Sequence, residues 1–376
     1  MKKVILMPDS FKGTMSSQEI CSIMSSVIKI HYPQSEVVSI PVADGGEGTV
    51  DSFLKAVGGT KISIPVKGPY MEEIIGFYGI LPDGTAVVEM AAAAGLPLVG
   101  SNRQAHKTTT YGVGQLIADA VKRGCKEIVL GLGGSATNDL GCGAAVAMGV
   151  RFFDKDRKEF IPVGETLSMI SEIDVSKAKE ALTGVNVVTM CDIDNPLYGE
   201  TGAAYVFGPQ KGADEEMVKL LDEQLRAAAK VIESELGINV SLMPGAGAAG
   251  GMGAGTVAFF NAALRMGIEA VLDTVKFDEL AIGADYIFTG EGRIDTQSLR
   301  GKVVIGVSRR AMKYKIPVIA IVGDISDGIE SAYEQGVSGI FSINRVAVPF
   351  PEARQRARED LRLTMDNLIR FIKTNA

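Results

Sequence analysis

The first part of the chain alternates short apolar runs with segments of helical periodicity. Four consecutive apolar residues at 4–7 are typical of a buried strand, and a capping-box pattern begins at Ser16. The apolar residues that follow recur three and four positions apart, which predicts an amphipathic helix. A strand at 37–40 and a helix at 50–57 complete a β-α-β-α order, and this order predicts a parallel sheet.

The pattern changes between residues 61 and 91, where three strand-like runs are separated by Gly, Pro and Asp turn signals. Helical periodicity at 110–123 leads into a strand at 128–130. A long amphipathic helix is predicted at 214–236, and it is expected to end there because Gly237 follows. We expect these segments to build a second sheet with its own helices.

The β-α alternation returns in the last third of the chain, with strand runs at 286–288 and 318–322. The end of the chain thus resembles its beginning. We therefore predict an α/β protein in which a parallel-sheet, Rossmann-like domain carries an inserted second α/β domain, with the active site in the interdomain cleft. The predicted ranges are 1–65 with 265–376 for the discontinuous domain and 66–264 for the insertion.

Length and composition agree with this interpretation. A chain of 376 residues usually divides into two domains, and 46% apolar with 22% charged residues is an ordinary globular composition. The net charge of -7 offers no basic surface for nucleic acid or an anionic membrane, which leaves a small molecule as the expected partner. Four scattered cysteines and the lack of a long apolar segment predict a cytoplasmic protein.

Many of the 44 glycines of the chain fall in short loops, and several of these loops follow predicted strands, where the ligand crevice of an open parallel sheet lies. The first such loop offers Asp9, Ser10 and Lys12 beside a helix start, which suits an anion, although a simple turn with an N-cap fits as well. The second loop sets Asp44 and Glu47 among three glycines. These carboxylates are candidates for a substrate hydroxyl or a divalent cation.

The loop after the strand at 128–130 reads GLGGSATND and is interpreted as a phosphate cradle. Gly133, Gly134, Ser135 and Asn138 would hold phosphate at the start of the next helix. The same loop approaches the G-x-S-x-G nucleophile elbow of hydrolases. Both histidines of the chain precede Ser135, whereas the histidine of that elbow follows its serine, so a hydrolase is a minor alternative.

Three further loops carry polar groups or glycines. Asp192 follows a predicted strand in CDIDNP and suits magnesium, while an Asx turn before proline explains it equally. Lys211, in FGPQKG, offers a cation to a phosphate or only closes the loop before a helix. The run at 245–250 is a literal G-x-G-x-x-G, but Pro244 precedes it where a dinucleotide fingerprint needs a firm strand, so NAD binding is a weaker alternative.

A last loop, TGEGRID, follows the predicted strand at 286–288. Arg293 suits a substrate carboxylate, because its guanidinium binds carboxylates through two hydrogen bonds, and a local Arg–Asp surface pair is the alternative. Glu291 and Asp295 are candidate metal or hydroxyl contacts, and Lys302 is a candidate for phosphate. The chain has neither a Walker A motif nor the H-R-D loop of protein kinases.

Across nearly its whole length the chain resembles the bacterial glycerate kinase family. The resemblance is carried, in order, by the strings DSFKG, ADGGEGT, GGSATND, CDIDNPL, FGPQKGA, GAGAAGGMGAG and TGEGRIDTQSLRGK. It implies transfer of the γ-phosphoryl group of ATP to D-glycerate with Mg²⁺, by an enzyme with a two-domain α/β fold. The chain is most similar to the branch of the family that forms 2-phosphoglycerate.

This resemblance turns the loop residues into expected roles. Lys12 is expected to neutralise the transferring charge, and Asp192 to bind Mg²⁺ or take the hydroxyl proton. The other assignments are Asp9, Ser10, Asp44, Glu47 and Arg293 for substrate; Gly133, Gly134, Ser135, Asn138, Lys211 and Lys302 for ATP; and Glu291 and Asp295 with Asp192 for metal.

Three alternatives remain open at this point. The product is 3-phosphoglycerate in the first, the protein is an NAD-dependent hydroxy-acid dehydrogenase in the second, and it binds a metabolite without catalysis in the third. A homodimer is a candidate assembly. No nucleic acid or membrane partner is expected.

Overall fold

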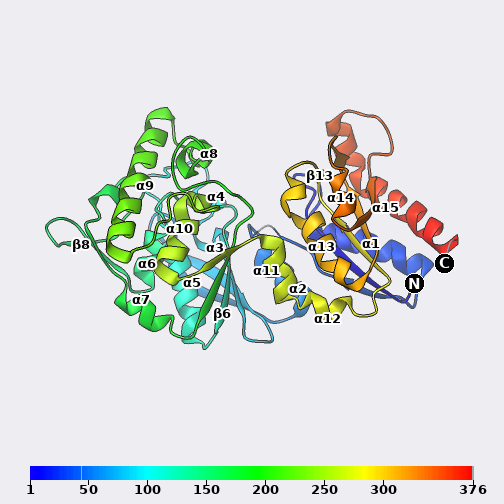
Figure 1. Cartoon of the computed structure of the whole chain (residues 1–376), viewed down its shortest axis with the longest axis horizontal. Helices are drawn as coiled ribbons and strands as arrows, with labels where there is room; N and C mark the ends of the chain where they lie inside the picture. Colours follow the sequence, from blue (N-terminus) through cyan, green and yellow to red (C-terminus); the bar gives the residue numbers. More distant parts are fainter. Residues whose placement is uncertain (44, 375–376) are drawn as a thin grey trace. The chain divides into compact units, whose positions relative to one another are not determined.

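The computed structural model describes residues 1–43 and 45–374, which form two compact units. Each unit has its own sheet and its own helices (Figure 1). Unit 1 is discontinuous in sequence, because a long segment of unit 2 interrupts it. Unit 1 comprises Met1–Ala43, Lys55–Val57 and Met266–Ala376, and unit 2 comprises Asp44–Leu54 and Gly58–Arg265.

A five-stranded parallel sheet forms the centre of unit 1, in the order β16-β14-β12-β1-β2. Counted along this unit alone, the order is 2-1-3-4-5, a doubly wound arrangement whose direction of winding reverses between β1 and β12. The predicted parallel sheet is confirmed. Its strands are β1 (Lys3–Pro8), β2 (Glu36–Ser39), β12 (Tyr286–Gly290), β14 (Val318–Val322) and β16 (Val337–Ser342).

Helices cover both faces of the unit 1 sheet. On one face, α1 (Ser17–His31) packs beside α15 (Phe350–Thr374), and on the other lies α13 (Val303–Ala311) (Figure 1). Alternate strand residues serve the two faces because side chains alternate along a strand: Ile319 faces α1 and α15, whereas Ala320 faces α13. The Ser16 side chain accepts a hydrogen bond from the Glu19 amide, so α1 begins where the capping box predicted.

The remaining elements of unit 1 are short. A two-stranded parallel pair joins β13 (Arg293–Ile294) to β15 (Asp324–Ile325). The other elements are α11 (Gly267–Thr274), α12 (Phe277–Ala281), α14 (Ser331–Glu334), η3 (Ser298–Arg300) and η4 (Met312–Tyr314).

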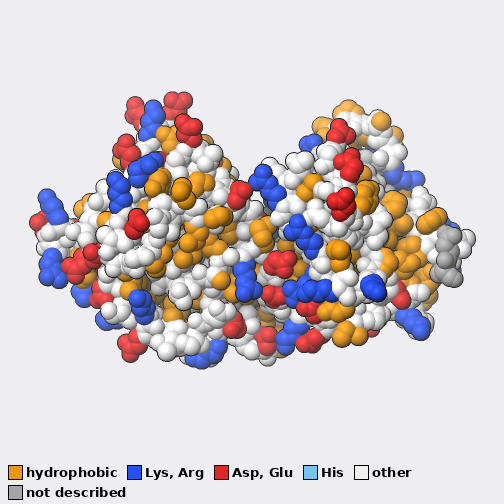
Figure 2. All heavy atoms as spheres, viewed as in Figure 1, with side chains coloured by type: hydrophobic (Ala, Val, Ile, Leu, Met, Phe, Trp, Pro, Cys, Tyr) orange, Lys and Arg blue, Asp and Glu red, His pale blue; other side chains and the backbone are white. Residues whose placement is uncertain are grey.

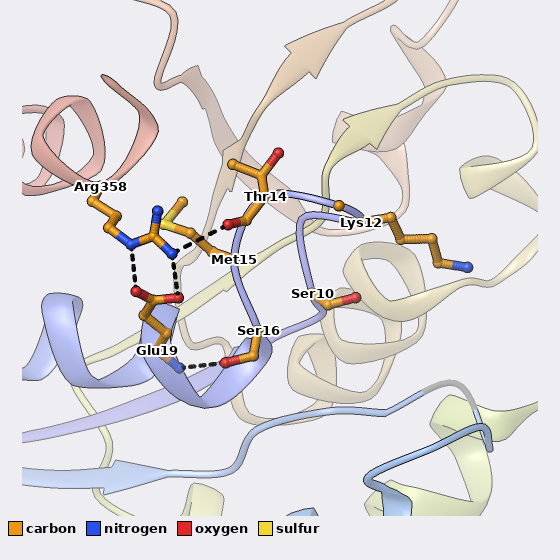
Figure 3. A pocket seen from close by; sticks show the side chains of 8 residues that line it. Ser10, Lys12, Thr14, Met15, Ser16, Glu19 and Arg358 are labelled. Carbon is orange, nitrogen blue, oxygen red and sulfur yellow. Dashed lines mark hydrogen bonds and ion pairs between the residues drawn. The ribbon is translucent and has the colours of Figure 1, made fainter. Parts of the chain in front are cut away.

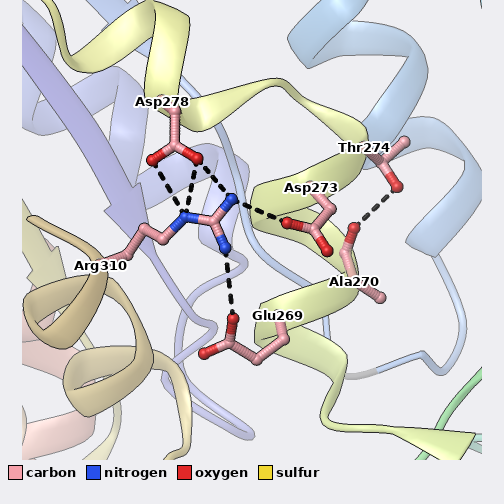
Figure 4. A network of polar contacts seen from close by, with 6 residues as sticks. All are labelled: Glu269, Ala270, Asp273, Thr274, Asp278 and Arg310. Carbon is pink, nitrogen blue, oxygen red and sulfur yellow. Dashed lines mark hydrogen bonds and ion pairs between the residues drawn. The ribbon is translucent and has the colours of Figure 1, made fainter.

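An arginine on α13 ties three helices of unit 1 together (Figure 4). The Arg310 guanidinium donates to both oxygens of Asp278 on α12, at 2.6 to 3.1 Å, and to Asp273 on α11 at 2.9 Å. Glu269, also on α11, lies 3.7 Å away. The hydrogen bonds from Arg310 lower the pKa of Asp278, and burial opposes this. This network holds α11 and α12 against the helix that follows the TGEGRID loop.

Unit 2 is built on a six-stranded mixed sheet in the order β11-β10-β6-β5-β4-β3. The strands β5, β6, β10 and β11 run parallel, and β3 and β4 are antiparallel. The second sheet predicted from the change of pattern after residue 61 is therefore present. The predicted boundary at 65/66 falls inside β3. The strands are β3 (Thr60–Lys67), β4 (Glu73–Ile80), β5 (Ala86–Glu89), β6 (Glu127–Gly131), β10 (Asn186–Met190) and β11 (Ala263–Arg265).

A three-stranded antiparallel sheet and several helices complete unit 2. The long helix α9 (Glu215–Leu236) starts at the N-cap Asp214 and ends at Gly237 in the left-handed conformation, as predicted. The small sheet contains β7 (Arg151–Phe153), β8 (Glu159–Phe160) and β9 (Glu172–Asp174). The other elements are α2 (Thr49–Val57, of which Lys55–Val57 belong to unit 1), α3 (Ala91–Ala94), α4 (Leu96–Val99), α5 (Tyr111–Lys122), α6 (Cys142–Ala147), α7 (Ser176–Ala181), α8 (Ala203–Phe207), α10 (Ala248–Phe260), η1 (Leu167–Met169) and η2 (Pro209–Lys211).

Charged groups of both signs are interspersed with apolar side chains on the face shown in Figure 2. This mixture agrees with the small net negative charge of the chain. Within residues 1–43 and 45–374, no helix is both long enough and apolar enough to cross a membrane.

Candidate functional site

Two glycine loops of unit 2 pass each other backbone to backbone. The amide of Gly133 donates to the carbonyl of Gly45 at 2.9 Å. A Cβ on Gly133 would lie 2.5 Å from the Cα of Gly46, and one on Gly131 would lie 2.4 Å from the Gly45 oxygen. Both distances are shorter than real Cβ contacts. These glycines are therefore required by packing, whatever ligand the loops bind.

Two acidic residues, Asp44 and Glu47, belong to the first of these loops. Asp44 lies outside the described residues. Glu47 is exposed. A third carboxylate, Glu89 at the end of β5, is almost fully buried and accepts from the amides of Gly48 at 3.5 Å and Val50 at 3.0 Å. Glu89 thus occupies the N-terminus of α2, a role for which the sequence interpretation had considered only Glu47.

The GLGGSATND loop does not lead directly into a helix, and in this respect the sequence interpretation was wrong. The helix α6 begins only at Cys142, after a left-handed residue, Gly141. The buried Asp139 side chain accepts hydrogen bonds from the Gly141 and Gly143 amides at 3.2 and 3.1 Å, and from the Thr110 amide and hydroxyl at 2.8 Å. Asp139 therefore uses the helix-start amides that the prediction had reserved for phosphate.

Other donors of the same loop remain available. Gly134 is exposed and has a φ of 73°. Among the described residues, the amides of Gly134 and Ser135 have no hydrogen-bond partner. Two neighbouring amides and the Ser135 hydroxyl thus form a small set of donors at the tip of the loop, and such a set suits an anion.

Lys211 is turned towards this loop from η2. Its Nζ donates to the Ser135 hydroxyl at 2.8 Å and to the Thr137 carbonyl at 2.7 Å, and the residue is only 2% exposed. Burial lowers the pKa of Lys211 to about 7, and the negative charge of Asp139 opposes this shift. Of the predicted phosphate ligands, the structure therefore brings Ser135 and Lys211 into direct contact.

Next to this contact, buried polar atoms lack partners. The Thr137 hydroxyl and both side-chain polar atoms of Asn138 have no hydrogen-bond partner among the described residues, and both residues are 0% exposed. Unsatisfied buried polar atoms are costly, so their presence together is typical of a functional site rather than of a packed core.

Asp192 lies in the loop after β10, at the same edge of the sheet as the loop after β6. The two strands are parallel neighbours, with Met190 opposite Gly131, and their following loops therefore leave the sheet side by side. Asp192 is half-buried. In the same loop the Asn195 side chain donates to the Thr201 carbonyl at 2.8 Å. The amide of Asn195 therefore has a local structural role.

The literal G-x-G-x-x-G run at 245–250 is a packing element. It follows α9 in the chain and not a strand. Ala249, Gly250 and Gly251 are left-handed within α10. A Cβ on Gly250 would lie 2.0 Å from the Thr137 carbonyl oxygen, and one on Gly245 would lie 2.7 Å from the Cys191 sulfur. The strand-turn-helix context of a dinucleotide fingerprint is therefore missing.

In unit 1 the polar residues gather where the winding of the sheet reverses, which is the usual ligand position in such sheets. Asp9 and Ser10 follow β1, and Glu291 follows its neighbour β12. The Glu291 carboxyl is 7% exposed, and its Oε1 has no partner among the described residues. The pKa of Glu291 is raised to about 7, chiefly by burial and also by Asp9 and Asp295, while Ser298 and Lys302 oppose this shift.

The other residues of the TGEGRID loop have local partners. Asp295 accepts from the amides of Gln297 at 2.8 Å and Ser298 at 3.1 Å. Arg293 donates to Ser326 at 2.8 Å and lies 3.8 Å from Asp324, with its side chain 63% exposed. This arrangement matches the surface-pair alternative for Arg293. Lys302 precedes α13, and its Nζ donates to the Gln297 side chain at 3.3 Å.

A cavity of about 520 Å³ lies beside the loop after β1 (Figure 3). It is lined by Ser10, Lys12, the start of α1 and Arg358 of α15. Arg358 is bound to Glu19 at 2.6 Å, while the Lys12 side chain points away from this pair. Sequence reasoning missed Arg358, because no motif surrounds it in the long polar helix.

Within residues 1–43 and 45–374, no three His, Cys, Asp or Glu side chains are grouped so that they could hold a metal ion. The predicted metal ligands Asp192, Glu291 and Asp295 belong to different units. Magnesium commonly binds through only one or two carboxylates, with phosphate and water as its other ligands.

The raised pKa of Glu291 makes the stability of the folded protein depend on pH. The folded protein keeps a proton on Glu291 up to about pH 7, whereas an ordinary glutamate loses it near 4.5. Folding therefore binds a proton in this window, and stability must fall as the pH rises through it. We expect Glu291→Gln, which cannot ionise, to stabilise the protein above pH 7 by up to about 3 kcal/mol.

The same variant should differ far less from the wild type at pH 5, where Glu291 is protonated in the folded state. Urea denaturation at pH 5 and pH 8, in buffer with EDTA, measures both values. Glu330→Gln, an exposed substitution in the same unit, serves as control. Equal effects of Glu291→Gln at the two pH values would contradict the prediction.

Comparison with known proteins places these loops in a family. The model of the glycerate kinase family matches residues 4–373. A glycerate kinase from Bacillus cereus is 46% identical over 368 residues, covering 97% of each chain. The glycerate 2-kinase of Escherichia coli is 42% identical over 343 residues, covering 91% of this chain and 90% of its own.

A solved structure extends the likeness to the fold. The crystal structure of a protein assigned as glycerate kinase 2 from Salmonella typhimurium LT2 matches with a TM-score of 0.86 at 38% identity, covering 100% of this chain and 99% of that one. The resemblance noted in the sequence is thereby confirmed. The chain belongs to the glycerate kinase family.

Proposed function

We propose that the protein transfers the γ-phosphoryl group of ATP to D-glycerate and releases 2-phosphoglycerate and ADP. The observation that carries the proposal is the E. coli relative named glycerate 2-kinase, which matches 91% of this chain at 42% identity. A family model spanning residues 4–373 supports the kinase activity independently.

We place the ATP phosphates on the loop at 131–139. Gly133 and Gly134 form its turn, and the amides of Gly134 and Ser135 have no partner among the described residues. Donors fixed before the ligand arrives stabilise the charge of a transferring phosphoryl group at little reorganisation cost. Asn138, whose buried side chain lacks a partner within the described chain, is a further candidate contact.

We place D-glycerate at the loop after β1. Asp9 and Ser10 would bind its hydroxyls, and Lys12 would neutralise charge on the transferring group, because Lys12 is an exposed cation on the same loop. Glu47 and Lys302 remain candidates for substrate and phosphate. Arg293 is a weaker candidate for the carboxylate, since its partners are Ser326 and Asp324.

We assign Asp192 to magnesium or to the proton of the acceptor hydroxyl, with Glu291 and Asp295 as further candidate ligands. Bound Mg²⁺ would neutralise phosphate charge as the phosphoryl group moves. A strand-end carboxylate such as Asp192 suits either task. We place the reaction in the cytoplasm, where ATP is made, and the four cysteines, all free, agree with a reducing compartment. A homodimer stays a prediction.

A product assay tests the proposal. The protein is incubated with ATP, Mg²⁺ and D-glycerate, and the product is passed to enolase with or without phosphoglycerate mutase. We expect enolase alone to consume the product, because enolase acts on 2-phosphoglycerate. Activity that requires the mutase would show 3-phosphoglycerate instead. Absence of any phosphoglycerate would overturn the proposed function.

Asp192→Asn tests the proposed catalytic carboxylate. The amide keeps the shape of the side chain but can neither bind Mg²⁺ strongly nor take a proton. We expect kcat to fall by roughly 10²- to 10³-fold, as when a catalytic acid or base is removed. Asp194→Asn changes an exposed carboxylate two positions away and serves as the matched control. Wild-type turnover in Asp192→Asn would exclude Asp192 from the reaction.

A further inference from the structure

The ammonium of Lys211 is buried in unit 2, with no ionic partner in residues 1–43 and 45–374. Its Nζ contacts the Ser135 hydroxyl at 2.8 Å and the Thr137 carbonyl at 2.7 Å. Within the part of the chain that the structure describes, Lys211 forms no ion pair, and Asp139 acts on it only through longer-range attraction. A lysine that is 2% exposed and unpaired costs free energy to bury, which calls for a functional reason.

The contact with Ser135 fixes the direction of the serine hydroxyl. A lysine ammonium has three hydrogens and no acceptor, so Ser135 Oγ must accept from Lys211. The hydrogen of the hydroxyl is then directed away from Lys211 and can be given to another group. It lies beside the Gly134 and Ser135 amides, which have no partner among the described residues. Three donors are thus left for one anion.

The situation reverses when Lys211 loses its proton. A neutral amine has a lone pair, so it can accept a hydrogen bond from the Ser135 hydroxyl while still donating to the Thr137 carbonyl. The hydroxyl hydrogen then bonds to Lys211 and is no longer available to a ligand, and the positive charge of Lys211 is lost. Both changes weaken the binding of an anion at the loop.

Charged and titratable groups surround Lys211 on several segments. Asp139 lies on the same loop as Ser135. Arg103 donates to the carbonyl of Gln210, the residue before Lys211, at 2.8 Å. Asp214 caps α9 three residues after Lys211, and Tyr205 lies on α8, which packs against η2. Burial lowers the pKa of Lys211 to about 7, which puts its titration near neutral pH.

We propose that Lys211 is a positioning residue that keeps the Ser135 hydroxyl as a hydrogen-bond donor to a phosphoryl oxygen of the bound nucleotide, and does so only while it is protonated. This inference rests on the proposed function, because it takes the loop at 131–139 as the phosphate site. A bound phosphate favours the protonated lysine. Nucleotide binding therefore takes up a proton above neutral pH and weakens as the pH rises.

The test measures ADP binding by isothermal titration calorimetry from pH 6 to pH 9. Each titration is repeated in two buffers of different ionisation enthalpy, which gives the number of protons taken up on binding. The variants are Ser135→Ala, which removes only the hydroxyl, and Lys211→Met, which keeps the length of the side chain. Lys219→Met, an exposed substitution on α9, is the matched control. Circular dichroism checks that each variant is folded.

Between pH 6.5 and pH 8.5 we expect the Kd for ADP to rise in the wild type and in Lys219→Met. This rise should be about tenfold larger than the rise in Lys211→Met, and ADP binding should take up protons near pH 8. Because the protonation of free ADP is the same in every titration at a given pH, comparing the variants at that pH removes its contribution. Lys211→Met should bind ADP weakly at every pH and take up no extra proton. Ser135→Ala should bind more weakly than the wild type chiefly at low pH, so its pH dependence is flatter.

Two results would overturn the inference, and they differ. If ADP binds the wild type with the same pH dependence and proton uptake as Ser135→Ala, Lys211 does not act through Ser135, while the proposed function survives. If the wild type does not bind ADP at any pH, both the inference and the proposed nucleotide site fail. Should Lys211→Met not fold, the comparison of the wild type with Ser135→Ala still decides the question.

Discussion

Two glycine backbones lie in direct contact in unit 2, and the geometry of its loop edge depends on that contact. Gly131 and Gly133 pack on Gly45 and Gly46 with no room for a Cβ on either Gly131 or Gly133, and a backbone hydrogen bond joins Gly133 to Gly45. The base of the loop at 131–139 is thereby fixed. Its tip at Gly134 remains exposed, with amide groups available to a ligand. Rigid support beneath available donors is what electrostatic catalysis requires.

Burial of ionisable groups is the second constraint on the molecule. Lys211 in unit 2 and Glu291 in unit 1 are both almost inaccessible to water, and burial brings the pKa of each to about 7. Neither has a full set of charged partners among the described residues. A protein retains such groups at a cost in stability, and the cost is explained if a phosphate or a metal-bound nucleotide completes their environment.

Local signals in the sequence predicted most of the fold. Ser16 and Asp214 cap helices where their side-chain chemistry indicated, because capping involves residues only three positions apart. Contacts between distant residues were not predictable. Lys211 meets Ser135 across 76 positions, Glu89 reaches the start of α2 across 39, and neither pairing has a local pattern. The contacts of Asp139 with the Gly141 and Gly143 amides at the start of α6 were not predicted either.

The claim most central to this account is that nucleotide phosphate binds at the tip of the loop after β6. Amide hydrogen exchange, resolved by residue with NMR and with saturating ADP and Mg²⁺, measures this directly. The Gly134 and Ser135 amides, which lack partners among the described residues, should exchange fast without ligand and slow by at least about tenfold when ADP is bound. Unchanged exchange at both amides, with protection appearing instead at residues 245–255, would contradict the account.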